Sequence, residues 1–324
     1  MKCISCNRDS KKTDRISNGG RCPSCHHPFV ADPAEHGLTD MAIKSAEDAV
    51  SANGTLYFSK DQLKYQLQRK LKKKLRMFNI AALIAAIIVV TALLFAIIKG
   101  GFFIPLTMFS GFIAIAIIGT RFKCAKSMGK LDNLISQWIT INPHAKLLTT
   151  ARYQDNQRST QNLDGISFDR VLVCDRNETV DFFLSNLFHF HYSCPVLGGN
   201  GYPQGIYEDM LVRLKQNPNL QVFLLHDYSP AGAVFVRRIK TDPKWFGGSQ
   251  FNIIDLGLNV GQKKLFKSMT IKKTDRNHKI SEHAELSLFQ PAALVAMCGA
   301  AINEGLPFDL ISSSSAADHS NGYG

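Results

Sequence analysis

The chain has 324 residues, of which 45% are hydrophobic and 20% charged, and its formal net charge is +12. A surplus of this size would indicate a nucleic-acid partner if it were spread over a soluble domain. Residues 1–120 carry 16 basic and 8 acidic side chains, whereas residues 121–324 carry 22 and 18. Lys60–Arg76 alone holds eight basic residues against one acid, Asp61. The charge distribution therefore does not require nucleic acid as a partner and points to a membrane surface.

Four cysteines near the N-terminus follow a metal-site pattern, because they form two CxxC pairs separated by 15 residues. They are Cys3, Cys6, Cys22 and Cys25. Each CxxC turn can present two sulfurs to one tetrahedral ion. The pattern resembles a zinc ribbon over residues 1–32, and this resemblance implies a fold without an activity. Four sulfur ligands leave no position for water, so we expect the zinc to be structural.

Other outcomes stay open for the cysteines at this stage. His26 and His27 follow the second pair directly and could replace a thiolate. Disulfides are a further alternative, although the reducing cytoplasm disfavours them. The remaining cysteines are scattered, and we expect them to be reduced and mostly buried on the cytoplasmic side. They are Cys124, Cys174, Cys194 and Cys298.

The segment after the ribbon is predicted to contain a linker, a helix and a short strand. Pro33–Gly37 is typical of a linker, and Thr39–Asn53 has apolar residues at helical spacing. Thr55–Phe58 is β-prone and is expected to dock on the ribbon as an edge strand. Ser59 and Gln62 match a capping box, so a new helix is predicted to begin there.

That helix is basic and carries a leucine every four residues from Leu63 to Leu75. The resulting apolar stripe is expected to lie against lipid, with helix pairing in a dimer as the alternative. Residues 33–76 are therefore interpreted as a linker and a basic juxtamembrane helix.

Two uncharged segments organise the whole chain. Met77–Ile98 has 22 residues without a charge, about 33 Å of helix, which is enough to cross a hydrocarbon core of about 30 Å. After a break at Lys99-Gly100-Gly101, Phe102–Thr120 gives 19 more uncharged residues for a second crossing. Residues 77–120 are thus predicted to form a two-helix transmembrane hairpin. Two buried helices of a soluble protein are the alternative.

Basic residues flank this hairpin on both sides, since Lys60–Arg76 precedes it and four more basic residues follow it. Those four are Arg121, Lys123, Lys126 and Lys130. Under the positive-inside rule both ends face the cytoplasm, so we expect a two-span protein of the cell inner membrane with both termini cytoplasmic. Residues 121–165 are predicted to form a second juxtamembrane helix and a polar tether.

Residues 166–310 show short, continuously apolar runs that alternate with helical patterns. The expected strands are residues 170–174, 194–197, 220–226 and 252–258, and the expected helices are residues 178–190, 206–216, 231–240 and 286–302. Such a pattern predicts a parallel sheet covered on both faces, a cytoplasmic α/β sandwich of Rossmann-like type. The whole chain is therefore predicted to be a multi-domain membrane protein. Its Ser-rich residues 311–324 are expected to be disordered.

Polar residues cluster where the predicted strands end, which is where ligands bind in such sheets. His226–Gly232 resembles the DxDxxG turn of Toprim domains, the metal-binding module of topoisomerases, primases and certain nucleases. Leu197-Gly198-Gly199 is similar to the glycine turn of that family. In Toprim proteins, a glutamate after the first strand and two aspartates hold Mg²⁺ for phosphoryl transfer.

The resemblance implies that Asp227 corresponds to the first aspartate and Gly232 to the glycine. Ser229 stands in place of the second aspartate, and Asp175 follows the first strand where the family has a glutamate, with Glu178 one turn further. The candidate catalytic residues are Asp175, Glu178 and Asp227, and the candidate ligand-binding residues are Gly198, Gly199, Ser229 and Gly232.

Other interpretations of the same residues remain open. Asp227 and Ser229 could cap the helix that begins at Pro230. Gly198–Gly201 and that helix start could instead bind an anion through backbone donors. Asp175–Thr179 also weakly resembles the metal turn of a von Willebrand type domain. The basic run Lys263–Lys279 could meet anionic lipid or nucleic acid, with a solvated face as the default.

Two functions follow from these observations. The first is a non-catalytic binding or assembly module that presents the zinc ribbon and the α/β domain to a protein partner, a second copy of the chain or an anionic ligand at the membrane. The second is a Mg²⁺-dependent enzyme of Toprim type that transfers phosphoryl groups or cleaves nucleic acid. Zinc is the expected structural metal, and Mg²⁺ belongs to the second function.

Overall fold

Two units divide the chain: the first comprises residues 1–49 and 63–145, and the second comprises residues 50–62 and 146–324. The structure is a computed structural model, and it describes residues 1–99, 119, 126–148, 168–204, 207–247, 251–259, 271–274 and 280–308. Most of the predicted second span, the tether and the C-terminal tail lie outside the described residues. So does the basic run after Lys263, apart from Lys272 and Lys273.

The first unit begins with two loops that hold the CxxC pairs, separated by the short helix α1 (Lys12–Ser17). The predicted linker contains a helix of its own, α2 (Pro33–His36). Asp32 caps this helix by accepting a hydrogen bond from the Ala34 N–H, and Pro33 occupies its first position. Gly37 ends it with φ of 67°, a left-handed conformation that glycine adopts without strain.

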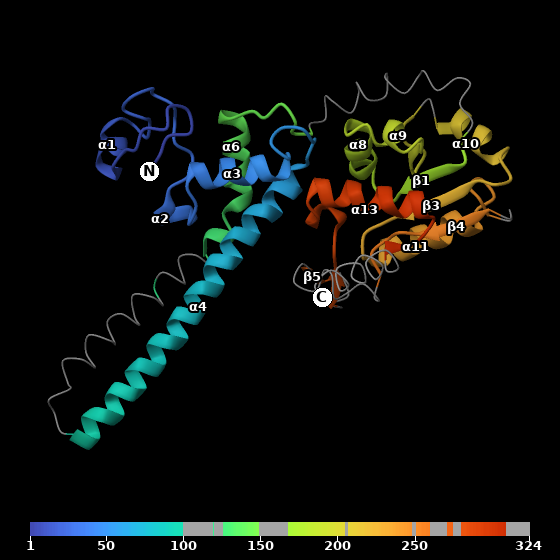
Figure 1. Ribbon diagram of the computed structural model, residues 1–324. Helices are drawn as coiled ribbons and strands as arrows, with labels where there is room; N and C mark the ends of the chain where they lie inside the picture. Colours follow the sequence, from blue (N-terminus) through green and yellow to red (C-terminus); the bar gives the residue numbers. More distant parts are fainter. Residues whose placement is uncertain are drawn as a thin grey trace, which may run out of the picture. The chain divides into compact units, whose positions relative to one another are not determined.

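Three helices form the core of the first unit: α3 (Asp40–Val50), α4 (Lys60–Lys99) from Leu63 onward, and α6 (Leu131–Ile141) (Figure 1). Their facing side chains are fully or almost fully buried. They include Ile43, Ala46, Leu63, Leu67, Leu71, Leu134 and Trp138. The predicted leucine stripe is therefore buried inside the unit through Leu71, rather than lying against lipid or a second chain.

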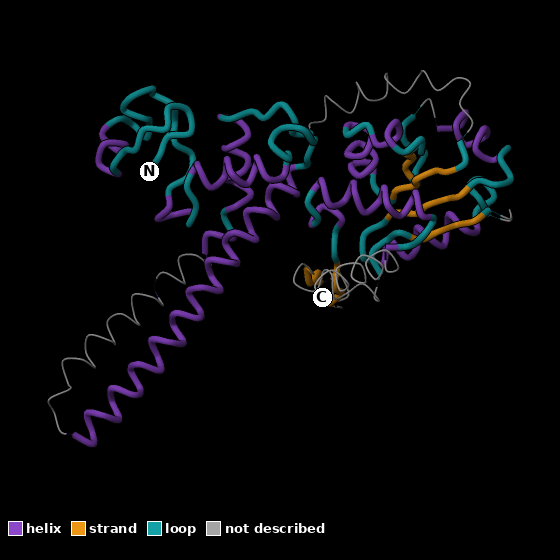
Figure 2. Tube along the Cα trace, in the orientation of Figure 1, coloured by secondary structure: helices purple, strands orange, loops and turns teal. Residues whose placement is uncertain are grey.

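The C-terminal part of α4 has a different environment. Figure 2 shows α4 as one unbroken helix. Between Lys60 and Thr91 it is long and apolar enough to cross a membrane, and only 6% of its apolar window is buried. Seven of its large apolar side chains between Met77 and Val90 are 49–65% exposed, whereas Phe78 and Val89 are half-buried. A core helix of a soluble protein would be mostly buried, so this exposure favours a spanning segment over the buried alternative.

The second unit contains a parallel sheet with the strand order β2-β1-β3-β4. The strands are β1 (Arg170–Cys174), β2 (Val196–Gly198), β3 (Gln221–Leu225) and β4 (Asn252–Asp255). Residues 171–174 and 222–225 are buried without alternation, as expected for strands covered on both faces. The strand order changes direction between β1 and β3, and this is the position where ligands bind in open α/β sheets.

Helices accompany these strands as predicted, with corrections in detail. They are α8 (Asn177–Ser185), α9 (Phe188–His191), α10 (Tyr207–Lys215), α11 (Pro230–Thr241) and α13 (Pro291–Glu304), with a 3₁₀ turn at Leu286–Leu288. The helix expected over residues 178–190 breaks into α8 and α9, because Leu187 adopts a left-handed φ of 55°. An antiparallel hairpin of β5 (Ile271–Thr274) and β6 (Ile280–His283) was not predicted.

Residues 50–62 precede the apolar part of α4 but belong to the second unit. Phe58 pairs with Leu147 in a parallel bridge, and the Tyr57 N–H donates a 2.8 Å hydrogen bond to the Asn186 side chain. The short strand predicted at residues 55–58 therefore docks on Leu147 and not on the ribbon. Ser59 and Gln62 form the predicted capping box, with reciprocal hydrogen bonds of 2.9 and 3.2 Å.

Candidate functional site

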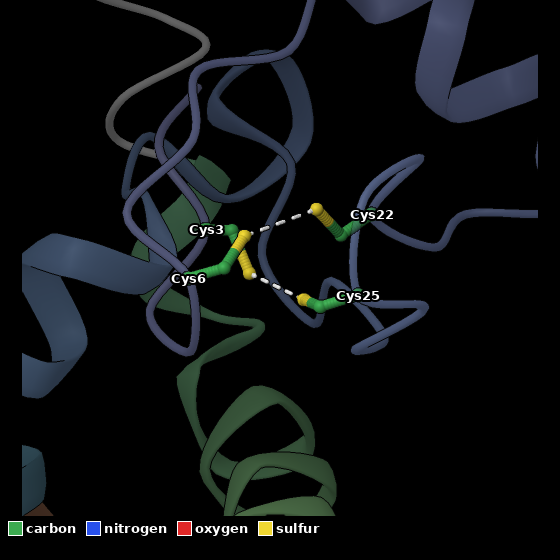
Figure 3. A group of neighbouring side chains, drawn as sticks. All are labelled: Cys3, Cys6, Cys22 and Cys25. Carbon is green, nitrogen blue, oxygen red and sulfur yellow. Dashed lines mark hydrogen bonds between the residues drawn. The ribbon is translucent and has the colours of Figure 1, made fainter.

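The N-terminal cysteines converge on one point in the structure. Figure 3 shows Cys3 and Cys6 on one loop facing Cys22 and Cys25 on the other. The Sγ atoms of Cys3 and Cys25 are 3.6 Å apart, as are those of Cys6 and Cys22. All four sulfurs lie within 4.8 Å of one another, and all four are free thiols.

The two loops share one backbone geometry, which explains how the sequence places the sulfurs. In the first, the Asn7 N–H donates to the Cys3 carbonyl at 3.0 Å; in the second, the His26 N–H donates to the Cys22 carbonyl at 2.9 Å. Asn7 and His26 both adopt a left-handed φ, of 57° and 56°. Each CxxC pair thus closes a tight turn that directs two sulfurs to the same side.

The spacing fits a single metal ion. Four sulfurs placed tetrahedrally at about 2.3 Å from zinc are about 3.8 Å apart, close to the separations in this cluster. Backbone N–H groups of Cys25 and Ser24 lower the pKa of Cys22 to about 6, whereas burial raises the pKa of Cys3 and contacts with the other thiols raise that of Cys6 to about 11. Cys22 is thus the thiol that is most readily a thiolate before a metal binds. The cluster contains neither His26 nor His27. The four cysteines could therefore hold a metal such as zinc without a histidine ligand.

A second candidate site lies at the carboxyl ends of β1 and β3. Asp175 follows β1 directly, and Asp227 lies two residues after β3. The backbone N–H of Asp227 donates a 3.1 Å hydrogen bond to Oδ2 of Asp175, so the fold brings these two predicted acids together. Glu178, in the first turn of α8, lines the same pocket as Asp227.

An arginine occupies the position facing Asp227. Nη2 of Arg176 lies 2.6 Å from Oδ2 of Asp227 and 3.8 Å from Oε1 of Glu285. The other oxygen of Asp227 accepts a 2.7 Å hydrogen bond from the Leu286 N–H. Burial and the nearby Asp175 charge nevertheless raise the pKa of Asp227 to about 6. The sequence pattern did not identify Arg176 as part of this site.

The pocket beside this pair is small, with a volume of about 80 Å³. Its polar wall includes Ser59 and Gln62 from the start of α4, together with Arg176 and Asp227. Phe182, Leu286 and Leu294 give it an apolar side. A drug-sized ligand needs several times this volume, so the pocket suits only a small group.

Ser229 and Gly232 have local structural roles. Ser229 is the N-cap of α11 and accepts a 3.0 Å hydrogen bond from the Gly232 N–H, and Pro230 occupies the first helical position. Capping therefore accounts for Ser229, whereas Asp227 does not cap this helix. A Cβ at Gly232 would lie 2.4 Å from the Asp227 carbonyl oxygen and 2.5 Å from Nδ1 of His226. Only glycine allows this close approach.

We expect Gly232→Ala to destabilise the second unit by about 2 kcal/mol, because the clash is with backbone and a buried ring rather than with a flexible side chain. Urea unfolding of the full-length protein in detergent, followed by hydrogen exchange of the sheet amides, measures this loss. Ala231→Ser at the exposed neighbouring position is the matched control. A wild-type unfolding midpoint for Gly232→Ala would contradict the close packing.

The glycine turn after β2 is also closed by internal contacts. The N–H groups of Gly198, Gly199 and Gly201 donate to the carbonyls of Tyr202, Cys174 and Gly198 at 2.7, 2.8 and 3.1 Å. The Gly199 carbonyl accepts a 2.7 Å hydrogen bond from Arg238. These three backbone donors are already paired and are not free to bind an anion.

Two buried polar pairs were not predicted. His226 contacts the Asp227 carbonyl through Nδ1 at 2.8 Å and Oδ1 of Asp255 through Nε2 at 3.1 Å. Burial favours a neutral ring, but both partners are acceptors, and together they raise the pKa of His226. Asp181 accepts a 2.6 Å hydrogen bond from the Tyr202 hydroxyl, and burial raises the pKa of Asp181 to about 7. Long-range pairs such as these leave no local signal in a sequence.

The remaining described cysteines agree with the prediction, since Cys174, Cys194 and Cys298 are fully buried free thiols. Cys124 lies outside the described residues.

When the chain is compared with known proteins, it matches no protein-family model, no curated protein and no solved structure. The zinc-ribbon and Toprim resemblances therefore stay predictions that rest on the residues described above.

Proposed function

We propose that this protein is a membrane-anchored binding or assembly module without catalytic activity. In this proposal, a two-span hairpin anchors it in the inner membrane with both termini in the cytoplasm. The N-terminal cysteines hold a structural zinc ion in a ribbon, and the α/β unit is presented to a protein partner, a second copy of the chain or a small ligand.

The observation that carries the non-catalytic interpretation is the ion pair between Arg176 and Asp227. A divalent cation held by Asp175 and Asp227 would need the space and the negative charge that the guanidinium already uses. The hydroxyl of Ser229, which stands in place of the second Toprim aspartate, accepts the hydrogen bond that caps α11. Both positions that resemble the Toprim aspartates, Asp227 and Ser229, thus make structural contacts within the protein.

The exposed apolar surface of α4 supports the anchor. Side chains such as Met77, Leu83 and Val90 are 65%, 63% and 55% exposed, which is costly in water and favourable in a hydrocarbon core. Arg76 directly precedes this apolar surface, as expected for the cytoplasmic end of a span. The four-thiolate cluster supports a structural rather than a catalytic metal, because no ligand position is left for water.

Washing membranes with alkaline carbonate tests the anchor. We expect the full-length protein to stay in the membrane fraction, and a reporter fused after Gly324 to be active only in the cytoplasm. Release by carbonate would contradict the spanning helix. An external reporter with the protein still in the membrane would contradict the hairpin topology alone.

The second candidate function, Mg²⁺-dependent phosphoryl transfer or nucleic-acid cleavage, is favoured by one observation. Asp175 and Asp227 are adjacent at the position where ligands bind in such sheets, and Oδ1 of Asp175 is buried with no hydrogen-bond partner among the described residues. Titration of the full-length protein with Mg²⁺ or Mn²⁺ separates the two functions. The proposed module shows no binding that depends on Asp227, whereas the enzyme loses its metal in Asp227→Ala.

A further inference from the structure

One face of α4 carries four basic side chains without counter-charges. Arg69, Lys72, Lys73 and Arg76 are all exposed, and within the described part of the chain none has an ion-pair or hydrogen-bond partner. Their spacing of i, i+3, i+4 and i+7 places them on one side of the helix. We call this set the basic stripe.

Three other lysines of the same helix have partners within the protein. Lys64 forms a 2.6 Å ion pair with Asp132, and Lys70 and Lys74 donate hydrogen bonds of 2.9 and 3.0 Å to backbone carbonyls. These contacts hold α4 within the first unit. In the basic stripe, by contrast, like charges lie four residues apart and repel each other, which weakens a helix in the absence of an external anion.

The basic stripe continues directly into an apolar surface. Ile80, Leu83 and Ile87 follow Arg76 at steps of four, three and four residues, so they extend the same side of the helix. They are 52%, 63% and 55% exposed. A single partner that is anionic beside the basic stripe and apolar beside Ile80, Leu83 and Ile87 would complement both surfaces. A lipid leaflet is such a partner, because an anionic headgroup layer is followed by a hydrocarbon core.

The dimensions of the stripe agree with this partner. From Arg69 to Arg76 the helix rises about 10 Å, comparable to a headgroup layer of roughly 5–8 Å. We propose that the basic stripe binds the phosphate groups of anionic phospholipids in the leaflet that α4 enters. This inference rests on the membrane anchor of the proposed function, and it names the lipid class that the anchor selects.

The test uses the full-length protein in vesicles of equal parts phosphatidylglycerol and phosphatidylcholine. After extraction in mild detergent, quantitative mass spectrometry gives the ratio of the two lipids that co-purify. We expect wild type to enrich phosphatidylglycerol at least about threefold, because a single basic residue near an anionic surface already favours binding by about fivefold. The triple variant Lys72→Gln/Lys73→Gln/Arg76→Gln should return the ratio to about one.

A charge-matched control comes from exposed positions in the second unit, with Arg237→Gln/Lys240→Gln/Lys244→Gln expected to keep the wild-type ratio. Unchanged enrichment in the stripe variant would overturn the inference, and so would salt-sensitive binding of duplex DNA that only the stripe variant loses. Carbonate washing of the same vesicles separates the two failures. Release of wild type refutes the anchor, whereas retention with an unchanged ratio refutes only the role of the stripe.

Discussion

Replacing Cys22 with serine is expected to abolish stoichiometric metal binding and to unfold the N-terminal loops. The four sulfurs are close enough to share one ion, and the loops around them have no large buried core of their own. In such small domains the apparent zinc-binding free energy of about 10–16 kcal/mol is also the folding free energy. Atomic absorption should find one zinc per wild-type chain and less than one in Cys22→Ser. In the variant, the backbone amides at positions 3 and 22 should lose their protection from hydrogen exchange.

His26→Asn is the matched control for this experiment. Asparagine tolerates the left-handed φ of 56° at this position, as Asn7 shows at the equivalent position of the first loop. The variant should keep its zinc and its protected amides, because His26 lies outside the sulfur cluster. Loss of zinc in His26→Asn, or full zinc retention in Cys22→Ser, would contradict a four-cysteine site.

Arg176→Gln is expected to destabilise the α/β unit by about 3 kcal/mol at pH 8. The substitution leaves the Asp227 carboxylate buried without its cation, and breaking a buried ion pair typically costs 3–5 kcal/mol. We take the lower end, because the Arg176 side chain is 44% exposed and solvent screens part of the interaction. Urea unfolding of the full-length protein in detergent, followed at the β1 and β3 amides, measures the loss.

The pH dependence of this effect has a definite sign. The pKa of Asp227 is about 6 in the folded protein and about 3.9 when unfolded, so the folded state binds more protons between these values. Its contribution to stability therefore falls as the pH rises from about 4 to about 6. Removing Arg176 raises the folded pKa further. The loss in Arg176→Gln should consequently be smaller at pH 5, where Asp227 is protonated, than at pH 8.

A double-mutant cycle supplies the control. Asp227→Asn keeps an oxygen for the Leu286 N–H but removes the buried charge, so Arg176→Gln should cost little in that background. Arg176→Lys should lose less stability than Arg176→Gln because it keeps the positive charge. A loss that is equal at pH 5 and pH 8, or equal with and without Asp227, would show that Arg176 acts through packing alone.

Local patterns in the sequence were sufficient to predict part of this molecule. The CxxC spacing predicts the sulfur cluster because each pair acts within one tight turn. Continuous apolar runs predict β1 and β3 because buried parallel strands have no polar face. The Ser59–Gln62 capping box and the Ser229 cap of α11 are likewise contained within four residues.

Contacts between distant residues could not be predicted in the same way. Arg176 and Asp227 are 51 residues apart, and neither residue type nor periodicity indicates that they pair. The leucines from Leu63 to Leu71 have the same spacing whether they face lipid or a protein core, so only the positions of α3 and α6 decide between the two. Leu187 separates α8 from α9 in a left-handed conformation although leucine is a good helix former, because tertiary structure overrides its propensity.

The assignment of residues 50–62 to the second unit has a consequence for how this chain can be divided. The polypeptide passes from one unit to the other three times, after residues 49, 62 and 145, so neither unit is a contiguous stretch of sequence. A fragment that begins after the apolar segments would lack Phe58, the pairing partner of Leu147, and Ser59 and Gln62 of the pocket wall. The α/β unit therefore cannot be expressed intact as a C-terminal fragment, because residues before the long helix are part of its structure and line its pocket.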